Sequence, residues 1–408
     1  MKSGLLGRKL GHSYSPQIHE YLGEYTYDLF EKEPEEVGEF LLNGDFTGIN
    51  VTIPYKKDVI PFLDELSPKA IRMGSVNTVV RRADGTLFGH NTDYFGFHSM
   101  VCRSGLSVSG KKVLVLGSGG TSNTAVKVLE DLGANVIIVS RSGENNYGNL
   151  HLHRDAAVIV NTTPVGMYPQ TGVAPVDLTC FPGLEGVLDV IYNPARTKLL
   201  LDAEKLGLPH ENGLWMLVAQ AKEAAEYFGG KPLPDSLIEQ VYLKMSARMQ
   251  NVVLIGMPGC GKSTIVSLLA EALGRTVVDS DQKILEMAGK TIPEIFTEDG
   301  EAHFRQLETE VLAQLGKQSQ LLVATGGGCV TQQRNYPLLR QNSTVFWLVR
   351  DIEKLPTHGR PLSQVQKLSD MYAVRRPLYE AFADHVIDNN GTCQETVQQI
   401  LSKMEGNL

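Results

Sequence analysis

Two glycine-rich turns constrain what this chain can fold into, because each follows a short apolar strand and opens onto a helical pattern. The first is GSGGTS at 117–122, after KKVLVL, and the second is GMPGCGKST at 256–264, after NVVLI. Glycine permits the tight turn that brings main-chain N–H groups against a phosphate at the N-terminus of a helix. The sequence therefore predicts parallel strands covered by helices, with two separate sites for phosphate-bearing ligands.

The second turn matches the pattern GxxxxGK[ST] in full. Its lysine, Lys262, has the place from which the β- and γ-phosphates of a nucleotide are reached, and the hydroxyl that follows can hold Mg²⁺. The pattern predicts ATP binding but does not identify the group that accepts the phosphate. The residues expected to bind ATP are Gly256, Gly259, Gly261, Lys262, Ser263 and Thr264.

The first turn is a weaker signal, because Ser122 occupies the last glycine position of GxGxxG, and an ordinary strand-to-helix turn stays open. The turn lies within a strand, helix, strand run that is typical of a Rossmann dinucleotide domain. Arg141, between two serines, stands where an acidic side chain would hold the ribose of NAD. A cation there favours NADP, although a solvated surface arginine is the alternative. The expected NADP ligands are Gly117, Gly119, Gly120, Thr121 and Arg141.

Length and composition favour a multi-domain protein that acts on small molecules. The chain has 408 residues, of which 42% are hydrophobic and 21% charged, so two or three globular domains are expected. The net charge is -8 and no basic tract predicts a nucleic-acid surface. The chain has no run of about 18 apolar residues, so the sequence predicts no membrane span. The five cysteines are scattered without a disulfide pattern, and we expect a cytoplasmic protein. The oligomeric state stays open.

Seven motifs in the first 245 residues resemble those of shikimate dehydrogenase, in the order of that family. They are GHSYSPQIH at 11–19, NVTIPYK at 50–56, GSVNT at 74–78, NTD at 91–93, GSGGT at 117–121, NTTPVGM at 161–167 and QA at 220–221. The resemblance implies reduction of 3-dehydroshikimate to shikimate with NADPH. It also implies that Ser13 and Ser15 hold the substrate carboxylate. The implied ring contacts are Thr52, Asn77, Asp93, Tyr192 and Gln220, and the implied further cofactor contacts are Asn161 and Thr162.

Lys56 and Asp93 are the expected catalytic pair of this half. Reduction of a ketone places negative charge on its oxygen, so a proton donor must stand beside it. A lysine ammonium, with an ordinary pKa of about 10.4, can donate that proton, and a close carboxylate favours its charged form. A purely structural ion pair stays open as the alternative. For Ser13 and Ser15, capping of a helix that begins near Pro16 is likewise open.

Residues 251–408 resemble shikimate kinase. The motifs are DSD at 279–281, FRQLE at 304–308, TGGG at 325–328, GRPL at 359–362 and RRPLY at 375–379. The resemblance implies that ATP phosphorylates shikimate to shikimate 3-phosphate. It gives Asp281 the task of orienting or deprotonating the attacking hydroxyl, and Arg305 and Arg375 the task of holding the carboxylate. The remaining implied roles are Mg²⁺ binding for Ser263 and Asp279, substrate approach at Gly327 and Gly328, and contact with the transferred phosphate for Arg360.

Plainer interpretations stay open here as well. Asp279 and Asp281 can be ordinary carboxylates at the end of a strand, and Arg305 can pair with Glu301 or Glu308 on a helix face. Two stretches are shorter than the resemblance leads us to expect. About ten residues separate VFWLV from GRPL, which shortens the lid, and about a dozen separate Ser142 from AAVIVN. Because that second stretch is near the minimum for a parallel crossover, we expect a reduced helix there.

The sequence therefore predicts an α/β protein in three parts. These are a substrate-binding domain over 1–99, completed by helices in about 212–246, a Rossmann NADP domain over 100–211, and a P-loop domain similar to nucleoside monophosphate kinases over 250–408. The predicted function is that of a bifunctional shikimate-pathway enzyme that uses NADP(H), ATP and Mg²⁺. The alternatives are a quinate/shikimate dehydrogenase fused to another small-molecule kinase, and a metabolite sensor without catalysis.

Overall fold

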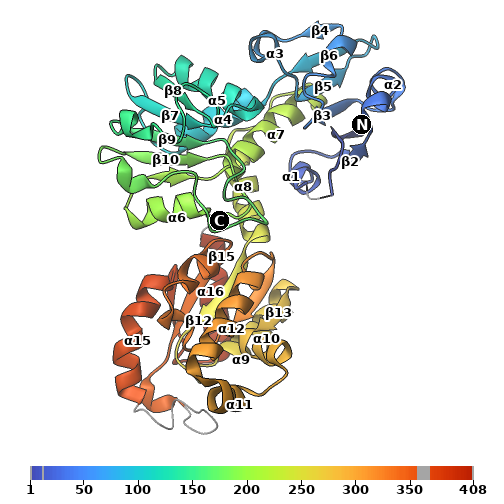
Figure 1. The fold of residues 1–408 in the computed structure, drawn as a ribbon. Helices are drawn as coiled ribbons and strands as arrows, with labels where there is room; N and C mark the ends of the chain where they lie inside the picture. The colour runs from blue at the N-terminus through green and yellow to red at the C-terminus, as the bar shows by residue number, and fades with distance from the viewer. Residues whose placement is uncertain (1, 12, 356–367, 407–408) are drawn as a thin grey trace. The chain divides into compact units, whose positions relative to one another are not determined.

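The computed structural model describes residues 2–11, 13–355 and 368–406, and the chain divides into two compact units (Figure 1). The first unit consists of Met1–Val165, Ala174–Tyr192 and Asp202–Met245. The second consists of Gly166–Val173, Asn193–Leu201 and Ser246–Leu408. Three sheets with helices on them make up the two units, which confirms the α/β class. The domain boundaries expected from the sequence stay a prediction.

The first unit contains a mixed six-stranded sheet formed by the start of the chain. β1 pairs in parallel with β2 and β3, whereas β5 is antiparallel to both β3 and β6. The end of β3 and the start of β5 therefore lie at the same edge. The spatial order is β2 (Thr26–Glu31), β1 (Lys2–Gly7), β3 (Gly48–Val51), β5 (Thr78–Arg81), β6 (Leu87–His90) and β4 (Glu65–Leu66). The helices of this stretch are α1 (Ser15–His19), η1 (Pro34–Glu36), α2 (Val37–Asn43), η2 (Ile60–Phe62), α3 (Pro68–Met73) and α4 (Asp93–Arg103).

The second sheet of this unit is parallel throughout, as expected for a Rossmann-type half. Its spatial order is β11 (His210–Glu211), β10 (Gly186–Asp189), β9 (Val158–Asn161), β7 (Lys112–Leu116) and β8 (Asn135–Val139). The helices of this stretch are α5 (Gly120–Asp131), η3 (Leu150–His153), η4 (Leu178–Cys180) and α7 (Leu214–Gly229), whereas α6 (Lys198–Lys205) begins in the second unit and ends in the first. The long helix α7 contacts α4, α1 and β3, so it returns to the first sheet.

The crossover from β8 to β9 contains only the short 3-10 helix η3, which confirms the expected reduction. Asparagine side chains hold this compact stretch instead of a helix. Asn149 donates to the Glu144 carbonyl at 2.9 Å and accepts from the Asn146 N–H at 2.8 Å, and Asn145 contacts His153 Nε2 at 2.9 Å. Without a full helix over it, Ile138 on the edge strand β8 is exposed.

The second unit is built on a parallel five-stranded sheet. The central strands β12 and β14 are buried along their whole length, while each of the edge strands β13 and β16 has only one buried residue. Strands covered by helices on both faces are expected to be continuously apolar in this way. The spatial order is β13 (Thr276–Asp279), β14 (Leu321–Ala324), β12 (Asn251–Ile255), β15 (Ser343–Val349) and β16 (His385–Asp388).

The helices of the second unit alternate with its strands. They are α9 (Lys262–Leu273), α10 (Ser280–Ala288), α11 (Ile292–Glu294), the π-helical turn η5 (Ile295–Asp299), α12 (Gly300–Leu315), η6 (Cys329–Thr331), α13 (Asn335–Arg340), η7 (Ile352–Lys354), α15 (Leu368–Phe382) and α16 (Cys393–Gly406). Between the two halves of the sequence, a single residue, Gln250, separates the end of α8 (Ser236–Met249) from the start of β12. No helix among the described residues is long and apolar enough to cross a membrane.

Asp384 anchors a buried ion-pair cluster in the second unit. Arg196, in the segment Asn193–Leu201 of this unit, donates to both carboxylate oxygens at 2.9 and 3.2 Å, and Arg340 donates at 2.7 Å. The Val345 N–H adds a bond of 2.8 Å. Burial alone would raise the pKa of Asp384, but these positive and N–H partners hold it below the ordinary value. Leu201, from the same segment, lies in the hydrophobic core of this unit.

We expect Asp384→Asn to lower the free energy of unfolding of the second unit by about 1–3 kcal/mol at pH 7. The change leaves the part-buried Arg196 and Arg340 without a negatively charged partner. The depressed pKa means that the carboxylate stabilises the fold above its unfolded pKa and loses this effect as the pH falls through the folded pKa. The difference between wild type and variant should therefore shrink as the pH falls below about 4, the ordinary pKa of an aspartate in the unfolded chain. Trp347 fluorescence in a Trp215→Phe background would report this unit.

Glu380→Gln is the matched control, because Glu380 forms an exposed i,i+4 pair with Arg376 in α15. We expect this change to alter stability by less than about 0.5 kcal/mol. An equal loss in both variants at pH 7, or a loss in Asp384→Asn that does not depend on pH, would contradict the assigned role of Asp384.

Candidate active sites

A cavity of about 280 Å³ lies in the first unit, at the edge where β3 ends and β5 begins. Polar side chains from separate loops converge on it. The predicted residues that line it are Ser13, Ser15, Thr52, Lys56, Asn77, Asp93, Thr121, Tyr192 and Gln220. The structure thus brings together the whole predicted substrate set of the first half, and Thr121 joins the cavity to the first glycine turn.

Lys56 and Asp93 form the closest charged pair of this cavity, with Lys56 Nζ at 2.6 Å from Asp93 Oδ2. Asp93 is the first residue of α4 and is buried, and its other oxygen accepts from Asn77 Nδ2 at 3.0 Å. Asn77 Nδ2 also reaches Gln220 Oε1 at 3.3 Å, while Asn77 Oδ1 accepts from the Thr92 N–H at 2.7 Å. The amide of Asn77 is therefore fixed in orientation and holds the carboxylate beside the lysine.

Ser13 and Ser15 lie at another wall of the cavity. Ser13 Oγ donates to Ser15 Oγ at 3.1 Å and accepts from the Ser15 N–H at 3.2 Å. Helix α1 begins at Ser15 and its N-cap residue is Tyr14, which makes no side-chain cap hydrogen bond. Neither serine is the N-cap residue, but Ser13 Oγ accepts the N–H of the first residue of α1, so capping of the helix end and exposure to the cavity are compatible.

The first glycine turn leads from β7 into α5, which begins at Gly120. Gly117 has a φ of 113°, and a Cβ there would lie 2.8 Å from Thr162 Oγ1, so only glycine fits. A Cβ at Gly119 or Gly120 would meet no atom within 4 Å, which leaves the helix N-terminus open. An open N-terminus of a twelve-residue helix fits the pyrophosphate of NADP(H).

The three other residues predicted to bind NADP are Asn161, Thr162 and Arg141, and they lie outside the glycine turn. Asn161 is buried at the end of β9, donates to Asp189 Oδ1 at 3.0 Å and accepts from the Thr163 N–H at 3.0 Å, so it shapes the loop beside the turn. Thr162 donates to the Leu116 carbonyl. Arg141 follows β8 and is exposed. Its role in choosing NADP stays a prediction.

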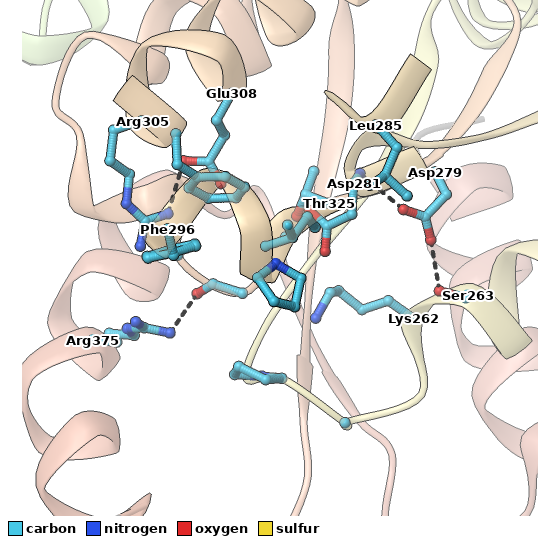
Figure 2. Close-up of a pocket in the computed structure, with 18 of the residues that line it drawn as sticks. Lys262, Ser263, Asp279, Asp281, Leu285, Phe296, Arg305, Glu308, Thr325 and Arg375 are labelled. Carbon is cyan, nitrogen blue, oxygen red and sulfur yellow. Dashed lines mark hydrogen bonds and ion pairs between the residues drawn. The ribbon is translucent and has the colours of Figure 1, made fainter. Parts of the chain in front are cut away.

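A larger cavity of about 730 Å³ lies in the second unit, over the ends of β12, β13 and β14 (Figure 2). Of the predicted residues it contains Gly259, Gly261, Lys262, Ser263, Thr264, Asp279, Asp281, Arg305, Gly327, Gly328 and Arg375. Arg360 lies outside the described residues. The nucleotide turn and the residues implied for the substrate therefore share one cavity.

Lys262 is buried in the second glycine turn and points back along it. Its Nζ donates to the carbonyl oxygens of Gly256 at 2.9 Å and Met257 at 3.0 Å. Gly256 and Gly261 have φ values of 144° and 100°, which other residues rarely adopt. Asn389 Nδ2 also donates to the Cys260 carbonyl. The main chain of the turn thus curves around the positively charged ammonium group of Lys262.

Ser263 and Asp279, the two residues predicted to bind a divalent cation, lie side by side in this cavity. Ser263 Oγ donates to Asp279 Oδ2 at 2.9 Å, and the other carboxylate oxygen caps α10 through the Asp281 N–H at 2.9 Å (Figure 2). A hydroxyl and one carboxylate are hard ligands that suit Mg²⁺, which completes its octahedron with water and phosphate oxygens. Among the described residues there is no group of three or more Asp, Glu, His or Cys side chains that could hold a metal ion.

Arg305 on α12 is held between two carboxylates, as the plainer interpretation expected. It donates to Glu308 Oε2 at 3.0 Å and to Glu301 Oε1 at 3.1 Å, and Figure 2 shows it beside Phe296 in the cavity. A Cβ at Gly328 would lie 2.4 Å from Arg305 Nη1, so this glycine makes room for the guanidinium. Pairing with glutamate and exposure to the cavity are therefore compatible.

Arg375 on α15 approaches the same glycine loop from another side. It donates to the Gly327 carbonyl at 3.1 Å, and the buried Tyr379 hydroxyl donates to that carbonyl as well. A Cβ at Gly327 would lie 2.6 Å from Pro258 Cδ. The Gly327–Gly328 main chain is therefore packed between the nucleotide turn and two arginines.

The sequence assigns no catalytic or binding role to Glu308 or Tyr379. It predicts Glu308 only as a partner of Arg305, and Tyr379 only as the last residue of the motif RRPLY. Glu308 is completely buried, and burial, opposed by Arg305, raises its pKa to about 7. A glutamate at i+3 from an arginine gives no signal of burial by itself, because most such pairs are on the surface. The apolar FRQLETEVL spacing around it was the available clue.

Comparison with known proteins finds a matching family for each half of the chain. A family model described as the shikimate dehydrogenase substrate binding domain matches residues 5–79, and one described as shikimate kinase matches 258–405. The shikimate dehydrogenase (NADP(+)) of Clostridium perfringens is 36% identical over 267 residues, which covers 60% of this chain and 98% of that protein.

The similar solved structures are dehydrogenases, and each covers about 60% of this chain. A chorismate mutase/shikimate 5-dehydrogenase fusion protein from Clostridium acetobutylicum is 34% identical, covers 60% of this chain and 96% of its own, and has a TM-score of 0.57. A quinate dehydrogenase from Corynebacterium glutamicum in complex with NAD is 28% identical, covers 60% and 99%, and has a TM-score of 0.55.

We expect Glu308 to titrate with a midpoint near pH 7, because its side chain is completely buried. Carbon-13 detection of labelled glutamate side chains would follow it, and the signal that disappears in Glu308→Gln identifies it. Glu294 provides an internal comparison, since hydrogen bonds from Thr291 lower its pKa. A Glu308 midpoint at or below that of Glu294 would contradict the burial of this carboxyl.

Proposed function

The chain belongs to the shikimate dehydrogenase family and carries a shikimate kinase unit behind it, and on this premise we propose two consecutive reactions on one ring. The first reduces 3-dehydroshikimate to shikimate with NADPH. The second transfers a phosphoryl group from ATP to shikimate and gives shikimate 3-phosphate. One observation supports the proposal most: each unit combines a glycine turn with a lysine and a carboxylate in a single cavity. A cytoplasmic location stays a prediction.

In the first reaction, Lys56 is the proton donor. NADPH, when bound at the open N-terminus of α5, supplies the hydride to the carbonyl carbon. The carbonyl oxygen gains negative charge as this happens, and the Lys56 ammonium can donate a proton to it. Asp93, with Oδ2 at 2.6 Å from Lys56 Nζ, holds the ammonium group in place.

The other polar side chains of the first cavity orient the ring. Ser13 and Ser15 offer neutral hydroxyl donors to the substrate carboxylate, while Asn77, Thr52, Gln220 and Tyr192 surround the space for ring oxygens. Because Asn77 is fixed by Thr92 and Asp93, the ring hydroxyls meet donors and acceptors of set direction. Such preorganisation keeps the ketone beside Lys56.

In the second reaction, phosphoryl transfer needs positioning and charge compensation more than covalent help from the protein. Ser263 and Asp279 would provide oxygen ligands for a Mg²⁺ ion that binds with ATP at the second turn. Lys262 compensates charge on the phosphates. Asp281, at the start of α10, faces the same cavity and can orient the attacking hydroxyl or accept its proton.

Arg305 and Arg375 would hold the substrate carboxylate in the kinase cavity. Both guanidinium groups border the Gly327–Gly328 loop, and their planar donor geometry suits a carboxylate. Glu301 and Glu308 fix Arg305 before substrate arrives. The ring would then lie between this loop and Asp281, with a hydroxyl toward the nucleotide turn.

Lys56→Met should slow the turnover of the ketone substrate by about 10²-fold to 10⁴-fold, because it removes the proton donor. The kinase reaction of the same protein should keep its wild-type rate. Both rates are measured on the purified full chain at saturating substrate. NADPH absorbance follows the reduction of 3-dehydroshikimate, and coupled ADP release follows the phosphorylation of shikimate.

Lys57→Met is the matched control, since this neighbouring lysine is exposed and should leave both rates unchanged. A wild-type rate of reduction in Lys56→Met would contradict the assigned donor.

Faster turnover of quinate with NAD than of shikimate with NADP would contradict the assigned substrate and favour the quinate alternative.

Lys262→Met should lower the kinase rate by about 10²-fold or more, because a preorganised positive charge at the phosphates is lost. Reduction of the ketone substrate should not change. Lys283→Met, a change of an exposed lysine paired with Glu286 in the same unit, should leave both rates at wild-type values. If Lys262→Met also slowed the first reaction, the two activities would depend on each other, contrary to the proposal.

A further inference from the structure

A chain of hydrogen-bonded side chains leads to the Asp93 carboxylate in the first unit. Tyr27 Oη lies 2.8 Å from Asn50 Oδ1, and Asn50 Nδ2 lies 3.2 Å from Thr78 Oγ1. Thr78 Oγ1 lies 3.1 Å from Asn77 Oδ1, and Asn77 Nδ2 lies 3.0 Å from Asp93 Oδ1. Asn50, Asn77 and Asp93 line the cavity, whereas Thr78 is completely buried at the start of β5.

Main-chain groups fix the orientation of both amides in this chain. A main-chain N–H can only donate a hydrogen bond, and a main-chain carbonyl can only accept one. The Thr92 N–H lies 2.7 Å from Asn77 Oδ1, so the amide oxygen of Asn77 belongs on that side. The Asn77 carbonyl lies 3.3 Å from Asn50 Nδ2, so the amino group of Asn50 belongs on that side. Each amide therefore has one orientation that satisfies its main-chain partner.

The Thr78 hydroxyl lies between the Asn50 amino group and the Asn77 amide oxygen, so the direction of its single hydrogen is set. It accepts from the amino group, which is a donor only, and donates to the amide oxygen, which is an acceptor only. Thr92 Oγ1 lies further away, at 3.4 Å. At the far end, the Tyr27 hydroxyl donates because it faces Asn50 Oδ1. Every bond of the chain therefore donates in the direction of Asp93.

The Thr78 hydroxyl joins the two halves of this chain. A hydroxyl that accepts one hydrogen bond donates a stronger one, because each bond polarises the next. Without this hydroxyl, the bond from the Asn50 amino group to the Asn77 amide oxygen through Thr78 is lost, and Thr92 is left as the donor to Asn77 Oδ1. Asn77 would then be held less firmly where it donates to Asp93.

We propose that Thr78 is a positioning residue of the dehydrogenase reaction, which fixes the Asn77 amide and through it the Asp93 carboxylate. This inference rests on the proposed function of the first unit. Asp93 Oδ2 lies 2.6 Å from Lys56 Nζ, so a displaced carboxylate also displaces the proposed proton donor. Because catalysis depends on the exact placement of reacting groups, Thr78 acts on the turnover of the bound ketone.

Thr78→Val tests the proposal, because it removes the hydroxyl and keeps the shape of the side chain. We expect kcat for the ketone substrate to fall about fivefold to tenfold, the range for loss of one hydrogen bond. The KM of NADPH and the kinase rate of the full chain should stay within about twofold of wild type, which shows that both units are folded. A raised KM of the ketone with unchanged kcat would overturn the proposal, and so would wild-type kinetics.

Thr78→Ser is the conservative variant, since it keeps the hydroxyl and removes the methyl group. We expect its kcat to stay within about twofold of wild type, because the hydrogen bond is kept. Equal losses of kcat in Thr78→Val and Thr78→Ser would mean that packing of the methyl group matters, and would overturn the proposal.

Thr86→Val is the matched control for loss of a bonded hydroxyl. Thr86 donates to Asp84 Oδ1 at 2.7 Å in the connection between β5 and β6, at the other end of β5 from Thr78. We expect wild-type kcat and KM for the ketone substrate. A loss of kcat equal to that of Thr78→Val would overturn the assigned role of Thr78.

A double-mutant cycle with Asn77→Ala tests whether Thr78 acts through Asn77. Thr78→Val should lower kcat in the wild-type background but by less than about 1.5-fold in the Asn77→Ala background. Equal factors in both backgrounds would overturn the proposal.

A measurement without substrate distinguishes failure of this inference from failure of the proposed function. In nitrogen-15 spectra of the full chain labelled at asparagine, the Asn77 side-chain signal is the one that disappears in Asn77→Ala. We expect this signal to shift in Thr78→Val and to keep its position in Thr78→Ser. An unchanged signal in Thr78→Val would overturn the inference, whereas failure of the wild-type chain to reduce 3-dehydroshikimate would contradict the proposed function.

Discussion

The polar side chains of both cavities depend on one constraint of parallel sheets, in which successive strands end at the same edge. In the second unit, β12 leads to Lys262, β13 to Asp279 and Asp281, and β14 to the Gly327–Gly328 loop. Each of these residues lies just after its own strand, and because the strands end at the same edge, residues far apart in the sequence lie close together there. The buried strands supply the rigid base, and the turns carry the chemistry.

The first unit meets the same constraint with a mixed sheet. Thr52 and Lys56 follow β3, which is parallel to β1, whereas Asn77 precedes β5, which runs in the opposite direction. Because an antiparallel strand begins where its neighbour ends, the start of β5 also delivers its side chain to this edge. Asp93 then follows β6 as the first residue of α4. Reversal of one strand therefore adds a residue to the site that an all-parallel sheet would place at the far end.

The sequence was sufficient where function depends on local pattern. The glycine turns, the lysine of the second turn and the alternation of strands with helices are all written in short stretches, and the reduced crossover after β8 followed from its length. Burial of Glu308, the packing of His19 on Tyr27 and the pairing of Arg196 with Asp384 depend on residues distant in sequence. A single sequence shows no such partner, so these features appear only once the sheets are assembled.

Lys262 has a consequence for how quickly the second turn can accept its ligand. Its ammonium group already occupies the turn through the Gly256 and Met257 carbonyls, and the main chain is already curved around it. Binding therefore exchanges the partners of one side chain instead of refolding a loop. Side-chain rotation takes picoseconds to nanoseconds, far less than loop rearrangement, so diffusional encounter and not reorganisation of the turn should limit the association rate.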